Sequence, residues 1–218
     1  MPTPAAFFRL EGVLVQRPPA LAAGWLAANA QHVRGRVSRL ASVAAAAPFS
    51  LGLGDAATGS RLTWMGLRGM SEDRLEVLGE EYWATWLAEG LRPAGVDLVQ
   101  RAKKEGFAVV LLSDHIAPIA RHALQAVKAD HLIANRPELR NGRATGRLVD
   151  PVVARFGGRP LRDFAAANDL DLSAARAYGS TAADQVLLSA LPWPCAVYPD
   201  RGLRRVARDL DWPVVEGA

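Results

Sequence analysis

The feature that most constrains this chain is an apolar run near its start that ends in a charged turn. Ala5–Leu10 is short and apolar apart from Arg9, which predicts a buried strand, and Glu11-Gly12 should end it. In α/β sheets, ligands bind in the crevice beyond the carboxyl ends of the strands. Arg9 and Glu11 fall at that point and share a side of the strand, so both are candidate site residues. The alternative is an edge strand with two solvated charges.

The second half of the chain alternates strands with helices. Phe107–Leu112 is a continuous apolar run, which is typical of a central parallel strand. The predicted strands, helices and turns that follow indicate a parallel sheet covered on both faces. They are helices at Pro93–Glu105, Ile116–Lys128, from Gly157 onward and at Gly202–Leu210, strands at His131–Ile133, Ala174–Gly179, Cys195–Tyr198 and Trp212–Val215, and a hairpin turn at Asn141-Gly142.

A helical block separates the two predicted central strands. Residues 16–92 are rich in helix-forming residues, and Ser71-Glu72-Asp73 supplies a helix N-cap with acids in the first turn. An apolar stripe within Ala20–Ala47 predicts a helix packed on its neighbours. The alternative for that stripe is contact with a membrane or an acyl chain.

Composition excludes several classes of function. The chain has 218 residues, half of them hydrophobic, and a net charge of +4 without a basic run interleaved with aromatics, so nucleic acid is not an expected partner. Cys195 is the single cysteine, which excludes an internal disulfide and a thiolate metal cluster. The N-terminus lacks the pattern of a signal peptide, and we expect a cytoplasmic protein.

Four loops at the predicted strand ends carry a recognisable order of motifs. The order resembles that of the haloacid dehalogenase (HAD) superfamily of phosphohydrolases, and in particular its phosphoserine-phosphatase-like branch (subfamily IB). The motifs are Phe7-Phe8-Arg9-Leu10-Glu11-Gly12-Val13-Leu14, Val109-Val110-Leu111-Leu112-Ser113, Gly158-Arg159, and Ala177-Tyr178-Gly179-Ser180-Thr181-Ala182-Ala183-Asp184. The resemblance implies a HAD-like Rossmannoid α/β core, residues 1–15 and 93–218, with an all-helical cap, residues 16–92, inserted after the first strand.

The resemblance also shows where this chain departs from the family. Family phosphatases use the first aspartate of the first motif as the nucleophile and the second as an acid/base, and these positions hold Arg9 and Glu11. The first aspartate of the fourth motif, a Mg²⁺ ligand in the family, is Ser180. Arg159 replaces the lysine of the third motif. Because two of the family's aspartates are replaced by Arg9 and Glu11, the catalytic positions Arg9, Glu11 and Asp184 form a degenerate set.

The departures lead to expectations about the site. Because Mg²⁺ requires hard anionic oxygens, we expect no metal site and no cofactor. Ser113, Arg159 and Arg9 are the expected ligands of a small anionic or phosphorylated molecule, with Ser180 and Asp114 elsewhere in the cleft. Arg9 should pair with Asp184, or with Glu11, in place of the missing cation.

Three functions remain open from the sequence. The first is a catalytically inactive HAD-like protein that binds a ligand or a protein partner. The second is a phosphomonoester hydrolase with an altered, metal-independent mechanism, in which Glu11 is the general base while Arg9, Ser113 and Arg159 hold phosphate. The third is a membrane- or lipid-associated accessory protein whose cap contacts the bilayer.

Overall fold

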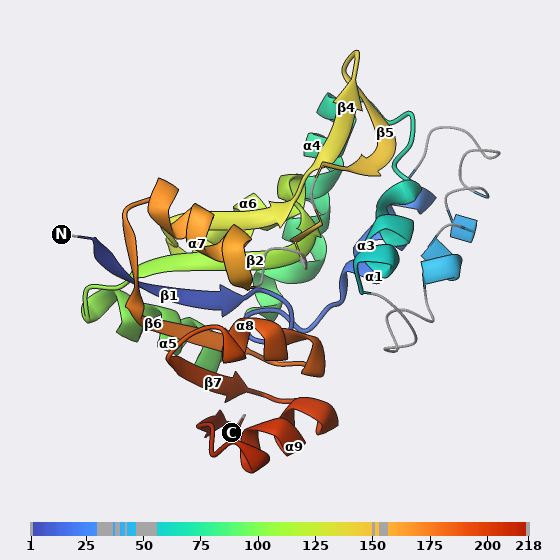
Figure 1. Cartoon of the computed structure of the whole chain (residues 1–218). Helices are drawn as coiled ribbons and strands as arrows, with labels where there is room; N and C mark the ends of the chain where they lie inside the picture. Colours follow the sequence, from blue (N-terminus) through green and yellow to red (C-terminus); the bar gives the residue numbers. More distant parts are fainter. Residues whose placement is uncertain are drawn as a thin grey trace.

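The computed structural model describes residues 2–29, 37, 40–41, 43–46, 56–149, 151–152 and 157–216. At its centre is a six-stranded sheet in which every neighbouring pair is parallel (Figure 1). Its order is β3 (His131–Asn135), β2 (Ala108–Ile116), β1 (Thr3–Arg9), β6 (Leu170–Gly179), β7 (Trp193–Val197) and β8 (Val214–Val215). The predicted HAD-like Rossmannoid α/β fold is confirmed, with β1 and β2 side by side in the middle of the sheet.

The alternation of side chains along β1 divides the core into two layers. Phe8 packs in one apolar cluster with residues of α5 (Pro93–Lys104) and α6 (Ala117–Val127). Phe7 belongs to the other cluster, which contains the buried faces of three further helices. These are α7 (Gly158–Ala167), α8 (Gln185–Ser189) and α9 (Arg201–Asp209). Helices therefore cover both faces of the sheet, which buries the strands and leaves their ends as the places where polar groups collect.

Between β1 and α5 the described residues form helices. They are α1 (Pro19–Ala28), α3 (Ala56–Met65) and α4 (Glu72–Tyr82), followed by a π-helical turn at Trp83–Leu87 and a 3₁₀ turn at Ala88–Gly90. Ser71 caps α4 as predicted, because its hydroxyl accepts a hydrogen bond from the Arg74 amide at 3.3 Å. Of the helix predicted over Ala20–Ala47, α1 is described, whereas residues 30–36, 38–39, 42 and 47 lie outside the described residues.

A two-stranded hairpin extends the cap. Strands β4 (Pro137–Arg140) and β5 (Arg143–Leu148) pair antiparallel around Asn141 and Gly142, whose positive φ values fit the predicted turn. Two backbone hydrogen bonds tie β5 to the segment before α4: Gly69 N–H donates to the Ala144 carbonyl, and Ala144 N–H donates to the Met70 carbonyl. The hairpin, placed in the core by the sequence analysis, thus lies beside the cap helices in Figure 1.

Helix α4 docks on the core through a glycine. A Cβ on Gly79 would lie 2.5 Å from the Pro118 carbonyl oxygen of α6, so the two helices approach closely only because Gly79 has no side chain. None of the helices in the described ranges combines the length and apolar character needed to cross a bilayer.

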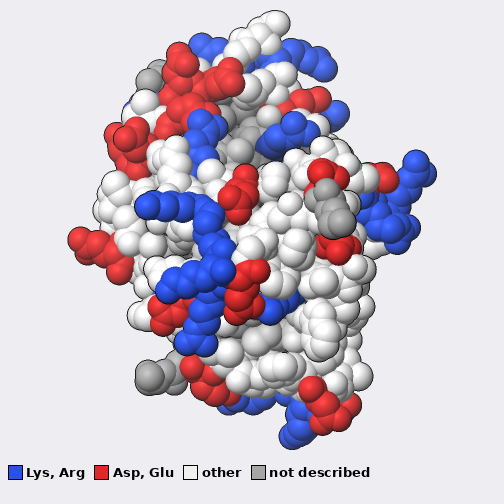
Figure 2. Space-filling model, turned by 90° about the vertical axis from the view of Figure 1, so that its left-hand side faces the viewer, with Lys and Arg blue, Asp and Glu red and all other residues white. Residues whose placement is uncertain are grey.

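The amino ends of the strands form a surface of mixed charge. Figure 2 shows this face, where Lys and Arg side chains lie among Asp and Glu side chains. Ion pairs at this end include Lys103 with Asp130 and Arg176 with Glu105.

Candidate active site

The site lies at the carboxyl ends of β1, β2 and β6. Gly12, in the turn after β1, has a φ of +82°, and a Cβ there would lie 2.4 Å from the Ser180 Cβ. Glycine is therefore required both by the backbone conformation and by the close approach of the β6 loop. This contact brings the two loops that carry Glu11 and Ser180 against each other.

Arg9 is the centre of the site. Its side chain is 4% exposed, and Nε lies 2.7 Å from Asp184 Oδ1. Nη1 donates to the Leu112 carbonyl at 3.2 Å, while Nη2 lies 2.5 Å from Asp114 Oδ2 and 3.1 Å from Glu11 Oε2. Burial alone would lower the pKa of Arg9, but the three neighbouring carboxylates outweigh burial and raise this pKa above its usual value. The predicted pairing of Arg9 is confirmed, and it involves Asp184, Glu11 and Asp114 together.

Asp184 is held in place by its own loop. Its side chain is 1% exposed, and Oδ2 accepts hydrogen bonds from the amides of Ser180 and Thr181 and from the Thr181 hydroxyl. Thr181 and Asp184 form a capping box around the 3₁₀ turn Ala182–Asp184, which fixes the position of the Asp184 side chain. The Ser180 hydroxyl donates instead to the Tyr198 carbonyl at 3.0 Å.

Glu11 joins Arg9 to the end of β2. Its Oε1 accepts from the Ser113 hydroxyl at 2.6 Å and from the amides of Asp114 and His115, and it lies 2.7 Å from His115 Nδ1. Burial alone would raise the pKa of Glu11, but the charge of Arg9 and the bonds from His115 and Ser113 hold this pKa well below its usual range. A carboxylate so fully engaged is a poor general base.

Asp114 differs from the other two carboxylates. Its side chain is 23% exposed, Oδ2 faces Arg9, and the buried Oδ1 has no hydrogen-bond partner among the described residues. Burial raises the pKa of Asp114, and the charges of Glu11 and Asp184 raise it further against the attraction of Arg9. Its backbone carbonyl accepts hydrogen bonds from Trp64 Nε1 and Asn135 Nδ2, so the residue is fixed from the cap side as well.

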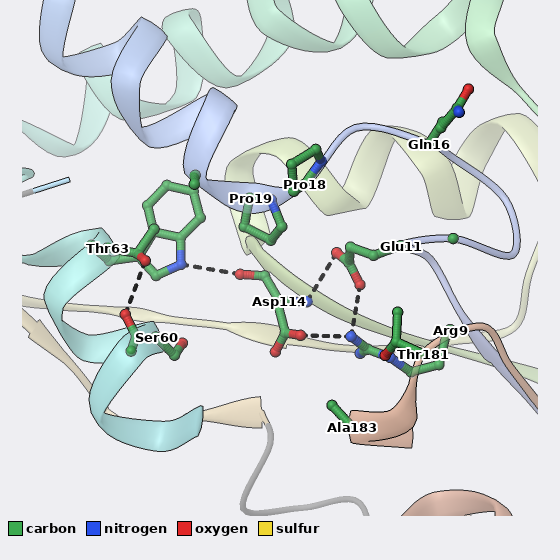
Figure 3. A pocket seen from close by; sticks show the side chains of 14 residues that line it. Arg9, Glu11, Gln16, Pro18, Pro19, Ser60, Thr63, Asp114, Thr181 and Ala183 are labelled. Carbon is green, nitrogen blue, oxygen red and sulfur yellow. Dashed lines mark hydrogen bonds and ion pairs between the residues drawn. The ribbon is translucent and has the colours of Figure 1, made fainter. Parts of the chain in front are cut away.

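A cavity of about 320 Å³ opens over this cluster between core and cap (Figure 3). Arg9, Glu11 and Asp114 line its core side, and Ser60 and Thr63 of α3 line its cap side. Figure 3 shows Pro18 and Pro19 above the carboxylates and Thr181 and Ala183 below them. Trp64 is 1% exposed, belongs to the apolar core and also forms part of the cavity wall.

The predicted anion ligands do not all meet at this cavity. Arg9 lines it, but its donors face the Asp184 and Asp114 carboxylates and the Leu112 carbonyl, and the buried Ser113 hydroxyl donates to Glu11. The Arg159 side chain is 86% exposed on α7, where it pairs with Asp163, and Arg159 is not among the described residues that line the cavity. Arg159 therefore occupies the expected position in the sequence, but its side chain does not lie at the cluster around Arg9.

Asp114 and His115 have larger roles than the sequence analysis gave them. Asp114 was expected only as a further cleft residue, and His115 is not among the residues that the sequence predicted for the site. The signal available was their place at the end of a strand directly after Ser113, next to the loop that carries Glu11. Within the described ranges, no group of three or more His, Cys, Asp or Glu side chains has an arrangement that could hold a metal ion.

Comparison with known proteins agrees with this geometry. The model of the haloacid dehalogenase-like hydrolase family matches residues 20–189. A putative hydrolase of Mycobacterium leprae is 29% identical over 97% of this chain and 72% of its own length. Phosphoserine phosphatase SerB1 of Mycobacterium tuberculosis is 29% identical over 97% of this chain and 70% of its own length.

A solved structure shares the whole fold. A protein of unknown function from Bordetella pertussis superposes with a TM-score of 0.84 at 23% identity and covers 99% of both chains. Family match, sheet order and motif positions agree, and the chain belongs to the haloacid dehalogenase-like hydrolases, as a homologue of their phosphatases.

Proposed function

We propose that this chain is a HAD-type phosphatase homologue that has lost aspartyl-phosphate chemistry and uses its cavity to bind a ligand. The observation that carries the proposal is the position of Arg9. A guanidinium stands where the family resemblance places the nucleophilic aspartate, and a guanidinium cannot attack phosphorus. Its contacts with Asp184, Glu11 and Asp114 hold it in that position.

The same contacts argue against Mg²⁺ at this position. The family implies a divalent cation among carboxylates, and here each of the three carboxylates directs one oxygen at Arg9. A Mg²⁺ ion would have to displace a buried guanidinium from these oxygens and would gain no carboxylate from Ser180. The residues present therefore do not fit a divalent metal ion.

The relatives supply a second candidate function. Several are named as phosphatases, including a phosphoserine phosphatase, which favours phosphomonoester hydrolysis by another mechanism. Glu11, the base expected for such a mechanism, has both oxygens engaged and a depressed pKa. Asp114, whose side chain is 23% exposed at the cavity and whose pKa is raised, is the better proton acceptor there.

A turnover assay separates the two candidates. Purified protein is incubated with a panel of phosphomonoesters that includes phosphoserine, with and without Mg²⁺, and phosphate release is measured beside an active phosphoserine phosphatase. We expect no release above that of the Asp184→Ala variant. Release that depends on Mg²⁺ would overturn the proposal, and release without metal that is lost in Asp114→Asn would establish the second candidate.

A further inference from the structure

The charge of the cavity identifies the class of ligand. Among the described residues that line it, Arg9 is the basic residue, and Glu11 and Asp114 are the acidic ones. Asp184, bound to the far side of the Arg9 guanidinium, adds a third carboxylate. One guanidinium among three carboxylates leaves an excess of negative charge, which repels a phosphate and attracts a cation.

Arg9 offers little to an incoming anion. Nε points to Asp184, Nη1 to the Leu112 carbonyl and Nη2 to Asp114, so all three nitrogens of the guanidinium already donate. A phosphate that reached Arg9 would have to replace one of these acceptors. Replacing the Asp114 contact would leave a buried carboxylate without its counter-ion, which is costly.

Asp114 offers an acceptor instead. Its Oδ1 is buried without a hydrogen-bond partner among the described residues, and its backbone is fixed by Trp64 and Asn135. The Asp114 side chain is 23% exposed and lines the cavity, so a ligand in the cavity meets this carboxylate although Oδ1 itself is enclosed. The geometry thus presents a pre-positioned carboxylate at the cavity wall.

The remaining walls suit an organic body. Pro18, Pro19, Ala20, Trp64 and Ala183 line the cavity with apolar surface, and Ser60 and Thr63 add hydroxyls on the cap side. We propose that the cavity binds a small organic cation, an ammonium group on an apolar body, with the Asp114 carboxylate as its counter-ion. This inference rests on the proposed function, since it takes the same cavity as a binding site.

Three probes of similar shape and different charge test the inference: benzylamine, benzyl alcohol and benzyl phosphate. Binding to the full chain is measured by isothermal titration at pH 7.5. We expect benzylamine to bind at least about tenfold more tightly than benzyl alcohol, which corresponds to a difference of about 1.4 kcal/mol in binding free energy. Benzyl phosphate should give no heat of binding. Asp114→Asn should reduce benzylamine affinity to that of the alcohol, while the exposed Asp163→Asn should leave it unchanged.

The wild-type comparison keeps the inference testable if the Asp114 variant does not fold. Added salt should weaken benzylamine binding and leave benzyl alcohol binding unchanged, because only the amine is held by charge. Equal affinity for amine and alcohol, absence of amine binding, or preference for benzyl phosphate would each overturn the ligand class. Phosphate release from the phosphomonoester panel, with benzylamine still preferred in titration, would overturn the proposed function alone.

Discussion

Arg9 Nε and Asp184 Oδ1 lie 2.7 Å apart although 175 positions separate the two residues in the sequence. Parallel pairing of β1 with β6 brings their carboxyl ends together, and the capping box of Thr181 turns Asp184 toward β1. Both side chains are buried, so removing either one leaves the other as a buried charge that has lost a counter-ion. The free energy of unfolding therefore reports whether the ion pairs of the site are intact.

Arg9→Met and Arg9→Asp should each lower the free energy of unfolding by about 3–5 kcal/mol at pH 7, because both leave buried carboxylates without a counter-ion. Urea unfolding measures the loss. Arg159→Met is the matched control, since the exposed pair of Arg159 with Asp163 should contribute less than about 1 kcal/mol. Arg9 variants that unfold like the wild type would show that Arg9 contributes nothing to the fold.

Glu11→Gln should destabilise the protein at pH 7 by about 1–3 kcal/mol, because four hydrogen-bond donors lose a charged acceptor. The folded-state pKa of Glu11 is depressed, so its contribution is present above the unfolded pKa of about 4.3 and is lost as the pH falls toward the folded pKa. The gap between wild type and variant should therefore narrow below about pH 4. Chemical unfolding at pH 7 and pH 3.5 measures it, and a gap that widens in acid would contradict the assignment.

Asp114→Asn should raise stability at neutral pH. The pKa of Asp114 is raised in the folded state, so its favourable contribution is complete below the unfolded pKa of about 3.9 and is lost as the pH rises through the folded pKa. Asparagine does not ionise, so the stability that Asp114 loses on ionisation is retained, and the amide oxygen can still accept a hydrogen bond from Arg9. The free energy of unfolding is measured for Asp114→Asn, Asp163→Asn and wild type at pH 4 and pH 7.5. It should be higher than that of the wild type for Asp114→Asn alone, and only at pH 7.5. A lower value for Asp114→Asn at pH 7.5 would refute the charge argument.

Arg9→Asp combined with Glu11→Asp and Ser180→Asp should create a Mg²⁺ site, because the guanidinium leaves and two carboxylates join Asp184. Isothermal titration should detect Mg²⁺ binding in the triple variant, and adding Asp184→Ala should abolish it. Arg9→Asp alone should not bind the ion, since position 180 still lacks a carboxylate. Tight Mg²⁺ binding by the wild type, lost in Asp184→Ala, would show that the guanidinium does not exclude the metal.

Much of the fold could be predicted because its signals are local. The apolar run Phe107–Leu112 identified a central strand, although β2 extends to Ile116, which pairs with Asn135 of β3. Asn141-Gly142 identified the hairpin turn from its backbone preference alone. The attachment of that hairpin to the helices between β1 and α5 could not be predicted, since it depends on contacts between residues far apart in the sequence, such as the backbone hydrogen bonds at Ala144 and the hydrogen bond from Arg143 to the Gly69 carbonyl.

The ion pairs of the site could be predicted, because a buried charged side chain needs a partner of opposite charge. A buried Arg9 with acids at Glu11 and Asp184 had to form a pair, and it does. The exposed position of Arg159 was not predictable, because a motif gives the order of residues along the chain but not the direction of a side chain on its helix. The role of Asp114 depends on the exact approach of two loops, which the sequence does not encode locally.

The contact of one guanidinium with three carboxylates also limits the routes by which such a chain could change over generations. Exchanging Arg9 for an acid brings four carboxylates together before any metal site exists, and adding an acid at Ser180 first places it beside a pair that is already complete. Each single step toward the arrangement of acids typical of the family's phosphatases therefore passes through a less stable protein. Several coincident changes are needed to reach that arrangement, so the cluster around Arg9 resists stepwise substitution.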